Sequence, residues 1–489
     1  ISLICGIVFS RYILLSNYIY LGIFIFLLAS SLAFSIYRKK LKQFLVVLLA
    51  FCCGFLFYVV EMKNYTPPSI SGEQEITARV SAQSSIKSKY QCVILDDVVI
   101  NGEKQSYNIM LVNYNTGNLF NDGEIISGKA TLTNSNIFFK DSLNSSVYKN
   151  NIKYVTRTKL SDFDIVGKDL KFNEKVQQSV KNQLDKFMTE ENSAIDYAMM
   201  FGDKSEISYD VRDDFSKSGI AHILAISGLH VGVLVGFVMW ILKKCKVNRF
   251  VSLGIISAFL ILYCYLCSFS PSIVRASIMS IILLLANSIG KRYDSLSSIG
   301  LAGILILIFK PLYTFDIGFQ MSFACVIGIA VLYPTINRFL MKIKFPKFLS
   351  QPLAMSISTQ IALIPILINC FGSFSILSVF LNIFVIPLFS VGYIIQFVFL
   401  PLTYITPFFG NFLYLTQLIL EAIKISASFV ASIPYTFISL FKLNFTIYLG
   451  YYALIFFASR MCLLNKRYKI AACVSVASLT TVASLILYF

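Results

Sequence analysis

Both histidines of the chain stand in one short stretch, His222-Ile-Leu-Ala-Ile-Ser-Gly-Leu-His230, at the head of an apolar segment that runs to about Leu242. Histidine can act as a base and serine as a nucleophile, and inside a bilayer such polar groups usually face a cavity, a pore or another helix. A structural interpretation competes with this one. Ser227-Gly228 would let a neighbouring helix approach, and each histidine would find a hydrogen-bond partner. These residues alone leave both interpretations open.

The sequence lacks the motifs that would complete a catalytic site. Two histidines cannot form a zinc site by themselves, and neither H-x-H-x-D nor H-E-x-x-H occurs. Ser227 lacks the G-x-S-x-G elbow of hydrolases, and no G-x-x-x-x-G-K-[ST] loop is present to bind ATP. Cys264 and Cys267 are spaced C-x-x-C inside an apolar segment without further ligands, which favours packing. We therefore expect no enzyme activity, no cofactor, no metal and no ATP hydrolysis by a Walker mechanism.

Charged residues are scarce after Asp214. The remaining 275 residues hold three acids, which are Asp294, Asp316 and Glu421. Arg275 stands just inside an apolar segment, and Gln320 lies one helical turn after Asp316. Ionisable groups inside a membrane are usually functional or paired. A structural lock of Arg275 with Asp316 and a polar pore lining are equally compatible with this pattern.

The composition is that of a polytopic membrane protein, because 56% of the 489 residues are hydrophobic and 14% are charged. The formal net charge of +17 invites a nucleic-acid interpretation, but five short stretches carry 18 basic residues and no acid. These stretches are Arg38–Lys42, Lys243–Arg249, Lys291–Arg292, Arg338–Lys347 and Arg460–Lys469. Basic short loops are typical of the cytoplasmic side, so the charge indicates orientation rather than affinity for DNA.

Apolar segments predict a mainly α polytopic fold with about 11 to 13 transmembrane helices. Three segments come first, at Ile1–Leu15, Tyr18–Tyr37 and Phe44–Val60. The others are Gly219–Leu242, Phe250–Ser268, Ile273–Ile289, Ser297–Phe309, Ile317–Leu332, Leu353–Asn369, Leu377–Leu400, Phe412–Ser432, Phe445–Ala458 and Ile470–Phe489. With the basic loops in the cytoplasm, residues 61–218 lie outside. No cleavable signal peptide is expected, and because the sequence starts at Ile1 it could belong to a longer protein.

Between the third and fourth spans the pattern changes to short strands. Pro67-Pro68 breaks the chain, and five runs of strand-like residues follow. These runs are Ile76–Val80, Tyr90–Ile100, Tyr107–Val112, Glu124–Leu132 and Ile152–Thr156. Asn101-Gly102 predicts a hairpin. The strand number predicts a small closed β-barrel of OB type, inserted at 66–171 as an extracytoplasmic domain, with a sandwich as the alternative.

Three helices are expected between this domain and the membrane. Apolar residues at helical spacing predict an amphipathic helix over 172–187, at the outer membrane surface. Shorter helices are expected near Ser193–Phe201 and Tyr209–Ser218. The predicted organisation is N-terminal membrane helices (1–65), the OB-like domain (66–171), interfacial helices (172–218) and a polytopic region (219–489).

The OB-like domain is almost neutral, because Glu61 to Lys171 holds 13 basic and 12 acidic residues. No long electrostatic groove is therefore expected. Binding of single-stranded DNA would need local contacts, in which lysine attracts phosphate and tyrosine stacks on a base. The candidates are Lys87, Lys89 and Tyr90 in one loop, with Lys149, Lys153, Tyr154, Arg157 and Lys159 in a second stretch. A solvated face over a barrel core is an equally good interpretation.

Four spaced motifs resemble those of the ComEC family, the inner-membrane proteins of natural competence. They are His222–Gly232, Pro271–Ala276, Gly290-Lys291-Arg292-Tyr293-Asp294 and Asp316–Phe323, and they follow the family's order. The resemblance covers nearly the whole chain, with leading helices, an outer OB-like domain and a polytopic region. It implies a channel that passes one strand of transforming DNA across the cytoplasmic membrane.

The resemblance also implies a set of residues and partners. The candidates for lining or shaping the membrane core are His222, Ser227, His230, Arg275, Arg292, Asp294, Asp316 and Gln320. The implied partners are single-stranded DNA, the lipid bilayer and other competence proteins, such as a DNA receptor and a cytoplasmic ATP-driven motor. Many family members end in a metallo-β-lactamase-like domain thought to degrade the other strand. Its histidine-rich motif is missing here, so nuclease activity is not expected from a member that is short or truncated.

Two other classes compete with a DNA channel. An ion-coupled secondary transporter of a small solute would favour buried carboxylates and an inverted repeat, and no repeat is obvious in the sequence. An intramembrane enzyme using His222 or His230 as a base lacks a convincing set of partner residues. The scarcity of acids suits a DNA path, because carboxylates repel phosphates, but it suits any anion path equally.

Overall fold

A computed structural model of the chain describes residues 2–4, 7, 41–65, 70, 72–83, 91–113, 120–135, 147, 150–157, 163–290, 294–433, 437–439, 445–458 and 473–476. Contacts divide the chain into two compact units. Unit 1, here called the β unit, comprises Ile1–Lys175 with Leu301–Phe319. Unit 2, here called the helical unit, comprises Val176–Gly300 with Gln320–Phe489. The expected spans Tyr18–Tyr37 and, for the most part, Ile1–Leu15 and Ile470–Phe489 lie outside the described residues.

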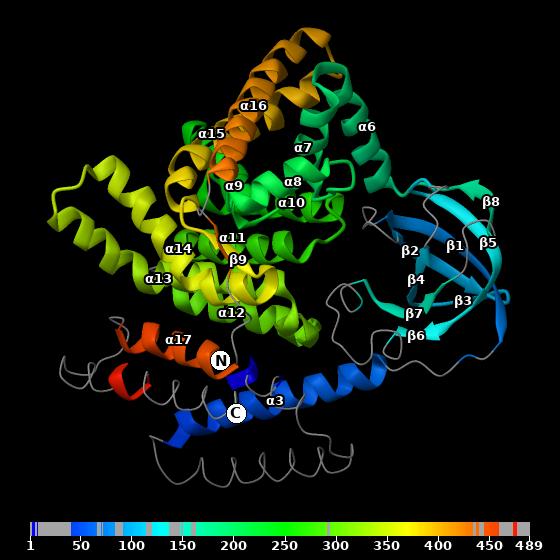
Figure 1. Cartoon of the computed structure of the whole chain (residues 1–489), viewed down its shortest axis with the longest axis horizontal. Coiled ribbons are helices and arrows are strands. Elements are labelled where there is room, and N and C mark those ends of the chain that lie inside the picture. The colour runs from blue at the N-terminus through cyan, green and yellow to red at the C-terminus, as the bar shows by residue number, and fades with distance from the viewer. Residues whose placement is uncertain are drawn as a thin grey trace. The chain divides into compact units, whose positions relative to one another are not determined.

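An eight-stranded sheet forms the body of the β unit (Figure 1). Its strands are β1 (Glu73–Gln83), β2 (Gln91–Ile100), β3 (Glu103–Lys104), β4 (Asn108–Asn113), β5 (Glu124–Thr131), β6 (Thr133–Asn134), β7 (Ile152–Thr156) and β8 (Phe163–Lys168). Hydrogen bonds place them in the order β6-β7-β4-β2-β1-β5-β8, with β3 paired to β2. The pair β4 and β7 is parallel. One face buries a continuous apolar core that includes Ile76, Val80, Leu95, Ile109 and Ile126.

The five expected strands are confirmed as β1, β2, β4, β5 and β7. The expected hairpin is confirmed too, because Asn101 and Gly102 join β2 to β3 with φ of 49° and 85°. Positive φ at both positions is what a tight type I′ turn requires. The sequence does not predict β8, in which only Phe163 is buried. The expected closed barrel was wrong for the described residues, where the sheet is open and its edge strands β6 and β8 do not pair.

A buried ion network ties the sheet to the first turn of α6 (Phe172–Phe187). The Arg79 side chain is 4% exposed, and its guanidinium contacts Asp96 and, at 2.6 Å, Glu174 Oε2. Lys171 Nζ lies 2.8 Å from the same Asp96 carboxylate. Burial lowers the pKa of Arg79, but the hydrogen bonds that its guanidinium donates to both carboxylates, together with their negative charge, raise it more, so the net shift is upward. The network therefore holds Arg79 as a cation inside the β unit.

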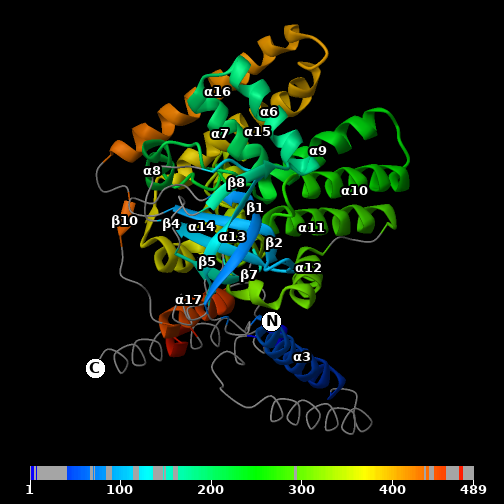
Figure 2. The same ribbon diagram turned by 90° about the vertical axis from the view of Figure 1, so that its right-hand side faces the viewer.

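The remaining elements are mostly helices. In the β unit, α3 (Leu41–Tyr65) packs on the 3-10 turn η2 (Pro311–Phe315). The other helices are α7 (Glu190–Phe201), α8 (Tyr209–Lys217), α9 (Gly228–Lys244), α10 (Arg249–Leu266), α11 (Pro271–Ser288), α12 (Ser295–Phe309), α13 (Ile317–Lys342), α14 (Lys347–Phe371), α15 (Ser378–Leu402), α16 (Gly410–Ser432) and α17 (Phe445–Ala458). Helices α10 and α11 lie side by side in both views (Figures 1 and 2). Two short strands, β9 (Ser373–Ser375) and β10 (Phe437–Ser439), pair antiparallel.

Six of the described helices are long and apolar enough to cross a bilayer, namely α10, α11, α13, α14, α15 and α16 with its preceding turn η3 (Pro407–Phe409). The protein is therefore a mainly helical, multi-pass membrane protein. Close backbone approach supports the packing of α13 on α14. A Cβ on Gly328 would lie 2.5 Å from the Ala362 Cβ and 2.9 Å from the Ser358 carbonyl oxygen. Small residues at such contacts are typical of membrane helices.

Several expected helix bounds need correction. The span expected over Gly219–Leu242 is helical only from Gly228 onward, because Ser227 caps α9 there. Helix α13 continues through Pro334 to Lys342, so part of the expected basic loop Arg338–Lys347 is helical. The amphipathic helix over 172–187 is confirmed as α6, and the two short helices that follow are confirmed as α7 and α8.

Candidate functional site

The serine and the second histidine of the His222–His230 stretch form the start of α9. Ser227 has extended backbone angles, and its Oγ accepts a hydrogen bond from the Leu229 amide at 3.2 Å. In return, His230 Nδ1 lies 3.3 Å from the Ser227 amide nitrogen and 3.1 Å from Ser227 Oγ. This reciprocal arrangement is a capping box, in which histidine replaces the usual glutamate. The unusual combination of Ser227 and His230 in this stretch is therefore explained by the way the two residues start α9.

The ring of His230 is fully buried against aromatic side chains of α15. Its centroid lies 4.7 Å from that of Phe389 and 5.1 Å from that of Tyr393, both edge to face. Within the described residues, Nε2 of His230 has no hydrogen-bond partner. A buried, unpaired ring nitrogen is unfavourable unless water or a moving group reaches it.

Two tyrosines extend this polar region toward α7. The Tyr393 and Tyr263 hydroxyls lie 2.8 Å apart, and the Tyr263 hydroxyl donates to the Met200 carbonyl oxygen at 3.0 Å. Cys267 donates to the same carbonyl at 3.5 Å. The expected packing role of the C-x-x-C pair is consistent with this contact and with the 3.4 Å approach of Cys264 to Ser277.

An acid that the sequence did not single out lies beside these tyrosines. Asp196 of α7 is 0% exposed, and neither carboxylate oxygen has a hydrogen-bond partner among the described residues. Gln396 of α15, also 0% exposed, lies close enough to influence the carboxyl without hydrogen-bonding geometry. Burial raises the pKa of Asp196 well above its usual value, and Gln396 lowers it only in part. We call Asp196, Ser227, His230, Tyr263, Tyr393 and Gln396 the polar core.

The polar core could have been found in part from the sequence. Gln396 and Asn382 are the two amides inside the expected span Leu377–Leu400. Asp196 is flanked by Ala194-Ile195 and Tyr197-Ala198, an apolar setting on both sides that is unusual for an acid in an amphipathic helix. Only tertiary packing shows that these groups are buried together.

Nothing in the polar core resembles an active site. Ser227 and His230 are adjacent, but the serine hydroxyl serves the cap and no acid is seen to orient the histidine ring. Across the described residues, no group of three or more His, Cys, Asp or Glu could hold a metal. The arrangement can therefore exchange protons or line a polar path, but it offers no nucleophile–base–acid series.

The other membrane candidates are dispersed. His222 lies half-buried in the loop before α9, where Gly219, at φ 79°, approaches Ser378 of α15 so closely that an added Cβ would clash. Arg275 is 2% exposed in α11 and donates to Ser272 Oγ at 3.1 Å. It belongs to the helical unit and Asp316 to the β unit, so their pairing stays a prediction.

Two candidate acids act at helix starts. Asp316 Oδ1 accepts from the Phe319 amide at 2.7 Å, at the beginning of α13. Asp294 Oδ2 accepts from the Ser297 amide at 3.0 Å, at the beginning of α12. Gln320 follows in the first turns of α13, half-buried, and Arg292 lies outside the described residues. Helix capping thus accounts for both aspartates without a pore.

A shallow cavity of about 660 Å³ opens on the β unit. Its lining includes Gln74, Asn101, Glu103, Tyr107 and Lys153. The Lys153 ammonium lies 5.4 Å from the centre of the half-buried Tyr107 ring, which contacts Tyr154 at 5.3 Å. Burial raises the pKa of Tyr107 to about 12. The cavity therefore joins an aromatic face to one cation and several amides.

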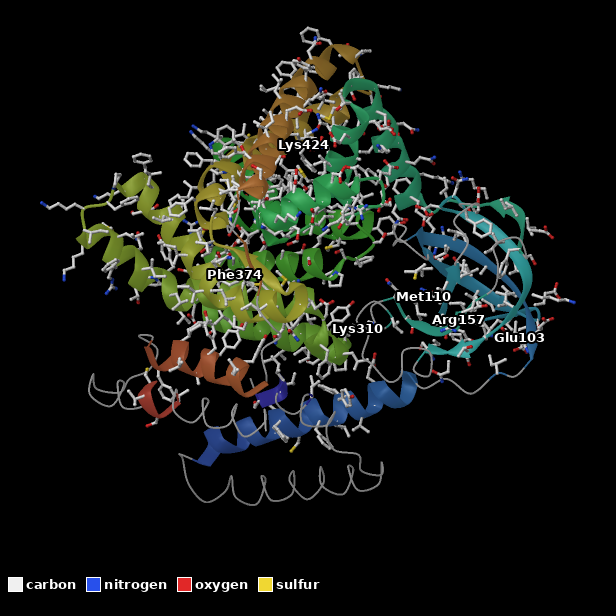
Figure 3. The ribbon with its side chains drawn as sticks, viewed as in Figure 1. Glu103, Met110, Arg157, Lys310, Phe374 and Lys424 are labelled. Carbon is white, nitrogen blue, oxygen red and sulfur yellow. The ribbon has the colours of Figure 1, made fainter. Side chains whose placement is uncertain are left out.

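The expected DNA-binding residues are only partly placed. Lys153 and Tyr154 both line the cavity, but the Tyr154 side chain is only 1% exposed and packs in the core, so the half-buried Tyr107 ring is the more accessible of the two tyrosines. Arg157 is exposed just after β7 (Figure 3). The other candidates, Lys87, Lys89, Tyr90, Lys149 and Lys159, lie outside the described residues.

Comparison with known proteins gives a consistent assignment for the helical region. The model of a family described as competence protein matches residues 199–465. The chain is 32% identical over 200 residues to the ComE operon protein 3 of Bacillus subtilis (strain 168), a match that covers 41% of this chain and 25% of that protein. It is 30% identical over 162 residues to an uncharacterized protein of Aquifex aeolicus (strain VF5), covering 32% of this chain and 36% of that protein. No solved structure matches the chain.

Proposed function

The chain belongs to the competence protein family, and on that premise we propose that it forms the part of a DNA-uptake system that passes single-stranded DNA through the cytoplasmic membrane. The observation that carries this proposal is the extent of the family match. Residues 199–465 include all six of the described helices that could cross a bilayer, together with every residue of the polar core except Asp196. The matches span only a quarter and about a third of the two curated relatives, so the role of the complete protein is part of the proposal.

The chain after Asp214 suits an anionic cargo in its charge. The three acids after Asp214 are each engaged, two of them in helix caps. The third, Glu421, accepts from Asn192 Nδ2 at 2.7 Å and lies 3.3 Å from Lys424 Nζ. A path with few available carboxylates repels phosphate less, because each unpaired carboxylate would raise the energy of a passing phosphate in a low-dielectric medium.

In the β unit, we propose that the cavity beside Tyr107 contacts the single-stranded DNA. The Tyr107 face could stack on a base, Lys153 could contact phosphate, and Asn101 and Gln74 could accept or donate hydrogen bonds. Glu103 on the same cavity offsets the lysine, so binding is expected to be weak and strongly dependent on salt. The domain boundaries 66–171, 172–218 and 219–489 belong to this proposal as well.

The energy and the remaining steps are assigned to partners. The sequence has no Walker loop, so an ATP-driven motor on the cytoplasmic side and a DNA receptor outside would complete the system. We assign no nuclease activity to this chain, because neither its sequence motifs nor the described residues provide a metal-ligand cluster.

Complementation tests the proposal most directly. A naturally competent host that lacks its own family member should regain uptake of labelled DNA when it expresses this chain, with or without an appended nuclease domain. Arg275→Ala should reduce uptake to background, because a buried cation is removed, whereas the exposed Arg249→Ala should leave uptake unchanged. Absence of uptake with a correctly inserted chain in both formats would refute the proposal.

One observation favours a second candidate function. An ion-coupled transporter of a small solute would be expected to bury a carboxylate in its core, as Asp196 is buried. Uptake of labelled DNA by cells expressing the chain separates the two functions, because such a transporter would not restore it.

A further inference from the structure

Asp196 stands where a carboxylate is strongly disfavoured. Its side chain is 0% exposed within the apolar cluster formed by α7, α9, α10, α15 and α16. No basic side chain forms an ion pair with it in the described part of the chain. A charge in such a setting loses its hydration without gaining a partner, so the neutral acid is favoured.

Gln396 supplies the complement of a neutral carboxylic acid. Both atoms of its amide group and both carboxyl oxygens of Asp196 lack hydrogen-bond partners among the described residues. A protonated carboxyl offers one O–H donor and one carbonyl acceptor, and a primary amide offers one acceptor and N–H donors. A proton on Asp196 would therefore let two otherwise unsatisfied groups satisfy each other. An ionised Asp196 would leave the Gln396 carbonyl oxygen unpaired.

The groups around the pair do not provide a competing charge. Tyr393, one turn before Gln396, interacts electrostatically with Asp196 and shares a hydrogen bond with Tyr263. Other titratable or charged groups on the elements packed there include His230 on α9, Cys267 after α10, Lys181 and Asp185 on α6, Glu191 on α7, and Glu421 and Lys424 on α16. Lys181 pairs with both Asp185 and Glu206, and Lys424 pairs with both Glu191 and Glu421, so each lysine already has two carboxylate partners and neither is left to balance a charge on Asp196.

We propose that Asp196 and Gln396 form a proton-binding site, in which the protonated carboxyl closes on the glutamine amide when α7 and α15 are packed and releases its proton to water when they separate. Only a proton moves in this step. The O–H bond of Asp196 breaks, the electron pair stays on the carboxylate, and water accepts the proton. The site would couple a proton to the motion of the helical unit whatever the cargo is, so it does not depend on DNA being that cargo.

Infrared difference spectroscopy on the full chain in lipid tests the site directly. At pH 7 the wild type should show a carboxylic-acid C=O absorption that is lost in Asp196→Asn. In Gln396→Leu the same absorption should persist and move to higher wavenumber, because the hydrogen bond to the amide is gone. No difference between wild type and Asp196→Asn at pH 7 would mean that Asp196 is ionised, which overturns the proposal. An unmoved absorption in Gln396→Leu would overturn the role of the amide.

Transport measurements test the coupling. Asp196→Asn should lose transport in the complementation assay, Asp196→Glu should retain part of it, and Thr416→Val should behave as wild type. Thr416 is a suitable control because its hydroxyl is also buried without a partner among the described residues. Wild-type transport with an unchanged pH profile in Asp196→Asn would overturn the coupling. Failure of the wild type to take up DNA would refute only the DNA function, since the infrared result stands without cargo.

Discussion

The β unit and the helical unit hold their buried ionisable groups differently. In the β unit, Arg79 is 4% exposed and lies between the carboxylates of Asp96 and Glu174. In the helical unit, Asp196 is 0% exposed and faces an amide and tyrosines. A sheet with one wet face can bring charged partners to its rim, where their remaining atoms reach water. Helices that exclude water on all sides do better with groups that can become neutral.

This comparison indicates that ion pairs stabilise one arrangement of the β unit, whereas protonation of a buried acid can change the packing of the helical unit. The Arg79 network joins β1, β2 and the first turn of α6, so it stabilises one arrangement. In the described residues, the polar core contains several polar atoms without partners, namely the carboxyl oxygens of Asp196, the amide atoms of Gln396 and Nε2 of His230. Unsatisfied buried groups lower the cost of moving to another packing, because little hydrogen bonding is lost.

The comparison of the two units assumes that the β-sheet lies in water outside the cell. Cysteine labelling should test that location with an all-or-none result. In a background without cysteine, Glu103→Cys on the exposed β2–β3 hairpin should react with an impermeant maleimide from outside (Figure 3). Lys246→Cys, between α9 and α10, should react only after the membrane is permeabilised, because basic loops stay in the cytoplasm. The reverse pattern would overturn the orientation and with it the comparison.

Removal of Arg79 should give the largest loss of stability. Arg79→Ala leaves Asp96 and Glu174 without their buried cation, a change worth about 3–5 kcal/mol in comparable sites. Protease sensitivity of the β unit in the membrane-inserted chain, followed against denaturant, would measure it. Lys104→Ala is the matched control, because that lysine is 72% exposed and its one ion pair among the described residues is with Asp97, for an expected loss of at most ~1 kcal/mol. Equal effects would show that burial of the pair is unimportant.

The pH dependence of stability should have opposite signs in the two units. The pKa of Asp97 is lowered, chiefly by Lys171, so its contribution is present above the unfolded pKa and is lost as pH falls through the folded value. The pKa of Asp196 is raised by burial, so its contribution is present at low pH and is lost as pH rises through the folded value. One proton changes stability by at most ~1.4 kcal/mol per pH unit.

Unfolding of wild type and Asp196→Asn, measured in detergent between acid and neutral pH, isolates the second effect. Wild type should lose stability relative to Asp196→Asn as pH rises, because Asp196 must stay protonated in the folded protein whereas asparagine does not titrate. Asp97→Asn supplies the matched comparison and should instead remove stability gained above acid pH. Parallel pH profiles for wild type and Asp196→Asn would mean that Asp196 has an ordinary pKa.

Local rules predicted much of the fold. Alternation gave five strands, Asn101-Gly102 gave the hairpin, and helical spacing gave α6 with its bounds. The errors concern features that depend on distant parts of the chain. The parallel pairing of β4 with β7 and the open edges of the sheet are long-range arrangements, which alternation along one strand cannot encode. The open sheet therefore replaced the barrel that strand number suggested.

The site was predicted less well than the fold for a related reason. Rarity in the sequence pointed to His230, Asp294 and Asp316, and all three turn out to serve helix starts. Asp196 was overlooked because ten acids crowd residues 172–218, and its apolar neighbours do not by themselves show that other helices bury the acid completely. A rare residue is conspicuous in a sequence, whereas a buried one is conspicuous only after folding.

Substitutions at Asp316 should have the smallest effect and decide between cap and charge. Asp316 Oδ1 accepts from the Phe319 amide at 2.7 Å, so Asp316→Ala should cost about 1 kcal/mol at the start of α13. Asp316→Ser keeps an oxygen that can accept the same bond but removes the charge, so it should restore stability and DNA uptake. If Asp316→Ser is stable yet inactive, the carboxylate itself is needed. In that case Asp316 would act through its negative charge, as a partner of Arg275 or in a pore lining, and not as a helix cap. An ionisable group with a function in the membrane would then exist outside the polar core as well.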